Sequence, residues 1–91
     1  MGSLMDIKNI RADFPVLDQQ VNGSPLIYFD NAATTQKPKS VMDALAHYYQ
    51  FDNANIHRGL HTLAERATTA YELTRVKVRD FIHAPSSDQI I

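Results

Sequence analysis

Apolar side chains recur at helical spacing along much of the chain, and this pattern constrains the fold more than any other feature. One stretch begins at Pro38, which suits a first helical turn because its missing N–H would be unpaired there. It predicts a helix over 38–51. A longer stripe predicts a second helix over 61–83. Its members are Leu63, Ala67, Ala70, Tyr71, Thr74, Val78, Phe81 and Ile82. The chain should therefore be mainly α-helical.

The residues before Pro38 have a weaker pattern. A short amphipathic helix is expected from about residue 4 to Phe14, after a Ser3 cap and before Pro15. A turn-forming cluster then leads into Leu26–Phe29, an apolar run that predicts a short strand. The fold class expected from these elements is mainly α with short β segments.

The chain ends on a second apolar run, which predicts a strand over 88–91. A strand needs neighbours for its backbone groups, so we expect this strand to be truncated. We therefore expect a single fragment over 1–91, with an N-terminal segment over about 4–37, the two helices and this strand. Such a fragment should leave apolar helix surface uncovered and self-associate or pack loosely.

The composition is that of an ordinary globular protein, with 91 residues, 44% of them hydrophobic and 21% charged. The formal net charge is −1 and the cationic residues are scattered, so neither nucleic acid nor an anionic membrane is an expected partner. No apolar run approaches the length of a membrane span, which is about 18 residues or more. The lack of cysteine excludes disulfides and fits a cytoplasmic location.

One candidate site is the loop Asp30–Lys37. Ala32 and Ala33 leave room for a substrate or another backbone, while Asn31 offers hydrogen bonds. The same residues also fit a plain turn, in which Asp30 and Asn31 cap the preceding strand and the alanines are packed filler. Spacing alone favours the plain turn.

A second candidate site is His57-Arg58-Gly59. Arg58 offers a planar fork for a carboxylate, and the His57 imidazole can exchange a proton near neutral pH. A solvated turn at the start of the following helix explains these residues equally well. His57 and His61 also have the spacing of two zinc ligands on a helix, but Gly59 disfavours a helix there and no third ligand is evident. No metal site is expected.

These stretches also carry a family resemblance. The run from Phe29 to Pro38 and the run from His57 to Leu63 resemble the N-terminal segment of SUF-type cysteine desulfurases, in the class V branch of fold-type I enzymes that use pyridoxal phosphate (PLP). The likeness is collinear from about Ile10 to Ile91 and includes 13–17 and 21–23. Family members are several times longer, so the resemblance implies the N-terminal fragment of an α/β fold.

The resemblance implies a PLP enzyme that converts L-cysteine to L-alanine and passes the sulfur, as an enzyme-bound persulfide, to an acceptor protein for iron–sulfur cluster assembly. It implies a homodimer. It places Asn31, Ala32 and Ala33 near the substrate side of the pocket. His57 and Arg58 are placed at the dimer interface, bordering an active site.

The resemblance also implies that the catalytic groups lie beyond Ile91. Lys8, Lys37 and Lys39 do not match the family's cofactor lysine, and the phosphate-binding turn and nucleophilic cysteine would follow later. We therefore expect no catalytic or cofactor-binding residue here and no activity from the fragment alone. A selenocysteine lyase, a cysteine sulfinate desulfinase and a non-enzymatic helical interaction module remain alternatives.

Overall fold

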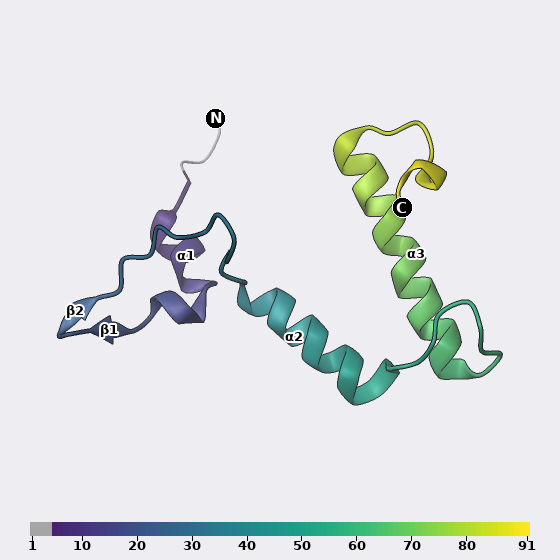
Figure 1. Cartoon of the computed structure of the whole chain (residues 1–91), viewed down its shortest axis with the longest axis horizontal. Coiled ribbons are helices and arrows are strands. Elements are labelled where there is room, and N and C mark those ends of the chain that lie inside the picture. Colours follow the sequence, from purple (N-terminus) through teal and green to yellow (C-terminus); the bar gives the residue numbers. More distant parts are fainter. Residues whose placement is uncertain (1–4) are drawn as a thin grey trace. The chain divides into compact units, whose positions relative to one another are not determined.

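The structure is a computed structural model that describes residues 5–91, and these fall into two units, Met1–Ala46 and His47–Ile91 (Figure 1). Each unit is held together mainly by its own contacts.

The first unit begins with helix α1 (Ile7–Ala12). Its cap is Asp6, whose carboxylate accepts the Asn9 N–H at 3.2 Å. Ser3, the expected cap, lies outside the described residues. Pro15 forces the preceding residue into an extended conformation, so α1 ends and the 3-10 helix η1 (Pro15–Leu17) follows.

Two short antiparallel strands, β1 (Gln20–Val21) and β2 (Ser24–Pro25), form a hairpin. Asn22 and Gly23 connect them with φ values of 53° and 80°, the left-handed pair that a type I′ turn requires. Leu26–Phe29, predicted to be a strand, has no strand assignment. The Leu26 N–H donates to Gln19 O, next to the hairpin, and the pairing ends there. Among residues 5–91 the rest of this run has no neighbouring strand.

Helix α2 (Lys39–His47) begins one residue after Pro38, as its first-turn position predicts. The predicted helix over 38–51 does not continue as a regular α-helix, because Tyr48–Asp52 form the π-helical turn η2. His47 Nδ1 lies 3.5 Å from Asp52 Oδ2, a pair five residues apart that matches the wider π spacing. The Tyr48 hydroxyl donates to Ala54 O at 3.1 Å and closes the end of the turn.

In the second unit, helix α3 (Thr62–Ile82) is the longest element, within the predicted range 61–83. Its N-terminal cap is His61, whose Nδ1 accepts the Ala64 N–H at 3.2 Å. It ends at His83, a left-handed residue with φ 58° whose N–H donates to Arg79 O. Histidine therefore fills a position where glycine is usual.

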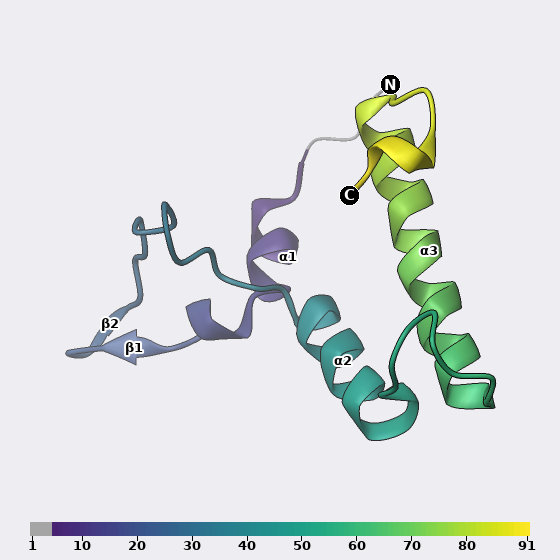
Figure 2. The ribbon, with the colours of Figure 1, turned by 45° about the vertical axis from the view of Figure 1, so that its right-hand side comes forward.

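The residues after α3 do not form the strand expected over 88–91. Ser86 Oγ accepts the Asp88 N–H at 3.1 Å and starts the 3-10 helix η3 (Ser87–Gln89). Figures 1 and 2 both show this turn folded back beside the C-terminal half of α3. A strand would need a backbone partner, whereas α3 supplies a side chain, Arg75, that bonds to Ser87 O and Ile90 O.

Burial is slight in both units. Ala64 and Ala67, both on α3, are the buried residues among 5–91. No helix within residues 5–91 is both long enough and apolar enough to cross a membrane.

Candidate functional site

Tyr28 shapes the first candidate loop, Asp30–Lys37. Its hydroxyl oxygen lies 2.7 Å from Asp30 O and 2.8 Å from Thr34 O. A phenol has one hydrogen, so it donates to one of these carbonyl groups at a time. The hydroxyl of this half-buried ring thus brings the Asp30 and Thr34 carbonyl groups close together within the loop.

Asn31 closes the same loop from within. Its side-chain Oδ1 accepts the Gln36 N–H at 3.3 Å, and its backbone carbonyl accepts the Thr35 hydroxyl at 3.0 Å. Ala32 and Ala33 lie in the exposed turn that follows. A hollow of about 280 Å³ adjoins the loop, and its lining includes Asn31 but neither alanine. The lining residues are Phe14, Leu17, Tyr28, Asn31, Thr35 and Gln36.

We expect Tyr28→Phe to loosen this loop with little effect on the rest of the fold. It removes only the oxygen that joins Asp30 and Thr34, and an ordinary hydrogen bond contributes about 0.5–1.5 kcal/mol. Amide hydrogen exchange at Gln36 should become faster by the corresponding factor. Tyr49→Phe is the matched control, because that hydroxyl makes no hydrogen bond with residues 5–91. Equal exchange in the two variants would contradict the assignment.

His57 opens the second candidate loop in a strained conformation, with φ 60°. Such backbone persists where several contacts hold it in place. Its N–H donates to Thr68 Oγ1 at 2.9 Å, and its ring meets Tyr71 edge to face with 6.0 Å between centroids. Its Nε2 lies 3.1 Å from Glu72 Oε1. Three side chains of α3 therefore hold this one residue.

Gly59 lets the loop approach α3 closely. A Cβ at this position would lie 2.6 Å from Ala64 Cβ and 2.9 Å from His61 Nε2. The absence of a side chain at 59 and the small one at 64 thus bring the loop backbone onto the first turn of the helix.

Arg58 is exposed, and its guanidinium makes no hydrogen bond or ion pair with residues 5–91. The neighbouring residues are engaged, His57 with α3 and His61 as the helix cap. Arg58 is therefore the group in this loop with donors available for a carboxylate or another anion.

The sequence placed His57 and Arg58 in one loop but gave no sign of Thr68, Tyr71 or Glu72 beside them. Their separation of three and four residues along α3 could have indicated a shared face. Asn31, Ala32 and Ala33 belong to the first unit, and the His57 loop belongs to the second. Residues 5–91 bring together no cluster of three metal-binding side chains.

The lysines of the chain are engaged locally or lie on the surface. Lys37 Nζ donates to Thr35 O at 2.6 Å, and Lys39 pairs with Asp43 on α2. Lys77 is an exposed residue of α3. The N-terminus of α3, where a phosphate could bind, already carries its own cap, His61. Residues 5–91 therefore do not by themselves form a site that fits PLP.

Comparison with known proteins gives consistent matches. The chain is 56% identical over 86 residues to a cysteine desulfurase of Synechococcus elongatus, covering 94% of this chain and 14% of that protein. It is 58% identical over 92 residues to a probable cysteine desulfurase of Streptomyces coelicolor, covering 100% of this chain and 22% of the relative. The chain thus spans a small part of these relatives' length.

A solved structure agrees with these matches. The apo structure of a cysteine desulfurase from Thermococcus onnurineus NA1 superposes with a TM-score of 0.75 at 42% identity, over 92% of this chain and 20% of that one. This confirms the fold class expected from the sequence, a mainly helical fragment of a fold-type I enzyme. The aminotransferase class-V family matches residues 27–91, most of the chain. The chain therefore belongs to the aminotransferase class-V family.

Proposed function

We propose that this chain is the N-terminal part of a PLP-dependent cysteine desulfurase. In that reaction the Cβ–Sγ bond of L-cysteine breaks, the sulfur joins an enzyme cysteine thiolate as a persulfide, and the remaining carbon skeleton takes up a proton to give L-alanine. PLP supplies the electron sink. We further propose a homodimeric, cytoplasmic enzyme that hands its sulfur to an acceptor protein for iron–sulfur cluster assembly.

The observation that carries this proposal is the extent of the match. Relatives named as cysteine desulfurases align with 94–100% of this chain at 56–58% identity, and the solved neighbour has the same name. Identity of this level over almost the whole length of the chain supports a shared role for the segment, and not only a shared fold.

The roles proposed for this segment are lining and positioning. Asn31, Ala32 and Ala33 would line the substrate side of the pocket, with Asn31 fixing the loop that presents the alanines. His57 and Arg58 would border an active site at the dimer interface, where the available Arg58 donors suit a carboxylate. Because residues 5–91 form no PLP site, we assign none of them a step on the cofactor, and the isolated segment should have no activity.

A chimera tests the proposal directly. This chain replaces the matched N-terminal segment of the Streptomyces coelicolor relative, to which it is 58% identical. We expect the chimera to bind PLP and to form alanine and sulfide from L-cysteine within about tenfold of the relative's rate, a loss of roughly 1.4 kcal/mol in transition-state stabilisation. A chimera that binds PLP with normal absorbance but forms no alanine would refute the proposal.

The alternative functions must be tested on the natural protein. Selenocysteine lyase and cysteine sulfinate desulfinase activity would be decided by assaying the protein purified from its source with each substrate. The intact mass of that protein comes first, since a mass near the 10.3 kDa of this chain would favour the non-enzymatic interaction module.

A further inference from the structure

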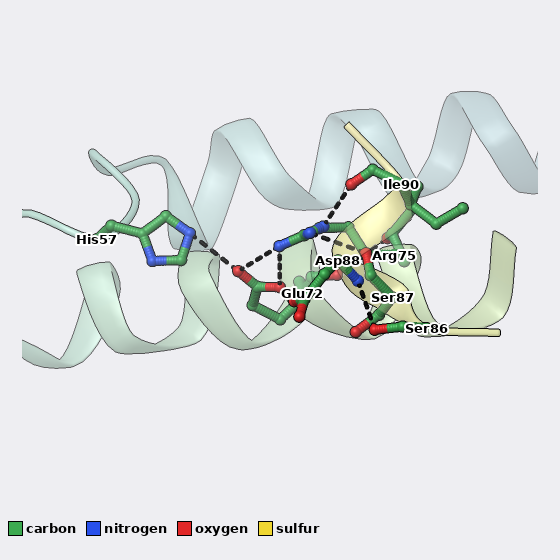
Figure 3. A network of polar contacts seen from close by, with 9 residues as sticks. His57, Glu72, Arg75, Ser86, Ser87, Asp88 and Ile90 are labelled. Atoms are coloured by element: carbon green, nitrogen blue, oxygen red, sulfur yellow. Dashed lines mark hydrogen bonds and ion pairs between the residues drawn. The ribbon is translucent and has the colours of Figure 1, made fainter. Parts of the chain in front are cut away.

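A continuous path of polar contacts joins the His57 loop to the C-terminal turn (Figure 3). Glu72 lies at its centre, with Oε1 3.1 Å from His57 Nε2 and Oε2 3.0 Å from Arg75 Nη1. Arg75 then donates from Nε to Ile90 O at 2.9 Å and from Nη2 to Ser87 O at 2.8 Å. Two segments that are distant in sequence are therefore connected through two side chains.

The path follows one face of α3. Thr68, Tyr71, Glu72 and Arg75 lie three, four and seven residues apart, so their side chains emerge on the same side of the helix. The first three contact His57, and Arg75 contacts the turn. A Glu and an Arg three residues apart usually pair on the exposed surface of a helix. Instead Arg75 is half-buried, with 26% of its side chain exposed, and points at backbone carbonyl groups.

The pairing also bears on the chemistry of His57. His57 Nε2 faces the Glu72 carboxylate, 3.1 Å from Oε1, so Nδ1 is the ring nitrogen that lies outside this contact. The strained backbone at His57 and the edge-to-face ring of Tyr71 fix the direction in which Nδ1 points. An imidazole held in this way suits orientation of a substrate or of a neighbouring side chain.

We propose that Glu72 and Arg75 are positioning residues, which orient the His57 imidazole and make its placement depend on the 86–90 turn. The predicted effect of these residues on catalysis rests on the proposed function. The physical coupling between the loop and the turn rests on the contacts above. Arg75 is suited to this role because three different nitrogens of its planar fork reach a carboxylate and two carbonyl groups, whereas a lysine would have to make all three contacts from one nitrogen.

Hydrogen exchange in the PLP-loaded chimera tests the coupling. The amides to follow are His57, bonded to Thr68, and Gln89 and Ile90, bonded within the turn. Glu72→Gln should speed exchange at His57 about fivefold, the effect of losing one ordinary polar contact. Arg75→Lys should speed exchange in the turn and also at His57. Glu65→Gln is the matched control, because Glu65 is on α3 but does not contact this path.

The kinetic readout separates positioning from simple destabilisation. Both variants should lower kcat about tenfold with KM changed less than twofold, because an imidazole directed wrongly affects the reacting geometry more than binding. The coupling would be overturned if Glu72→Gln left amide exchange at His57 unchanged. It would also be overturned if Arg75→Lys changed exchange only in the 86–90 turn. Normal kcat with altered exchange would overturn the catalytic role. A chimera that is inactive before mutation, yet shows the exchange pattern, would refute the proposed function and leave the coupling intact.

Discussion

The isolated 91-residue chain should keep its helical far-UV circular dichroism but melt without a cooperative transition. Among residues 5–91, only Ala64 and Ala67 are buried, and alanine contributes little apolar area. Large side chains remain in solvent, with Phe29 93%, Leu60 98% and Phe81 85% exposed. A chain must bury apolar surface to offset about 1–2 kcal/mol of backbone entropy per ordered residue. Neither unit has a core that does so.

Three measurements check this expectation. Near-UV circular dichroism should be flat, a dye for apolar surfaces should bind, and sedimentation velocity should show self-association that grows with concentration. The chimera is the control, because there the same residues have the remainder of an enzyme to pack against. A compact monomer with a sharp melting transition would mean that the exposed side chains find partners within the chain, and the fragment interpretation would fail.

The helices were predictable because their signals are local. Pro38 starts α2, and the apolar stripe together with the cap at His61 sets the extent of α3. Such signals depend on residues within a turn or two and need no distant partner. The type I′ turn at Asn22-Gly23 is local in the same sense.

The strands were not predictable in this way. Leu26–Phe29 and 88–91 have suitable residues, but a strand forms only where another backbone accepts its hydrogen bonds. In the second case Arg75, remote in sequence, takes the carbonyl groups instead. The π-helical turn η2 is followed by a hydrogen bond from the Tyr48 hydroxyl to Ala54 O, a contact that no periodicity reveals.

The loop residues of the candidate site were predictable, but the α3 residues that contact the loop were not. Residue chemistry singled out His57 and Arg58, because imidazole and guanidinium groups around a glycine are suited to binding. Glu72 has no such local signal in the sequence. Its contact with His57 depends on how the loop returns to α3, and that return depends on the small residues at 59 and 64.

We expect Gly59→Ala to disrupt the His57 loop. The new Cβ would lie 2.6 Å from Ala64 Cβ, which belongs to a buried residue, 1% exposed, and is fixed to the helix backbone. Neither group can rotate away, so the loop backbone must move. Overpacking of this kind costs about 1–3 kcal/mol. In the chimera, amide exchange at His57 should quicken accordingly, since its bond to Thr68 depends on the loop's position.

Two further variants show whether steric overlap is the cause. Ala64→Gly removes the atom that the new methyl group meets, so the double variant should be less perturbed than Gly59→Ala alone, although glycine in a helix costs about 0.5–1 kcal/mol. Gly23→Ala provides the contrast, because nothing lies within 4 Å of the added Cβ while φ is +80°. Its cost is backbone strain, so exchange should change only in the hairpin. If the double variant were as perturbed as the sum of its single changes, the overlap would not explain the effect. The constraint on Gly59 would then lie in the 2.9 Å approach to the His61 ring, which Ala64→Gly leaves in place.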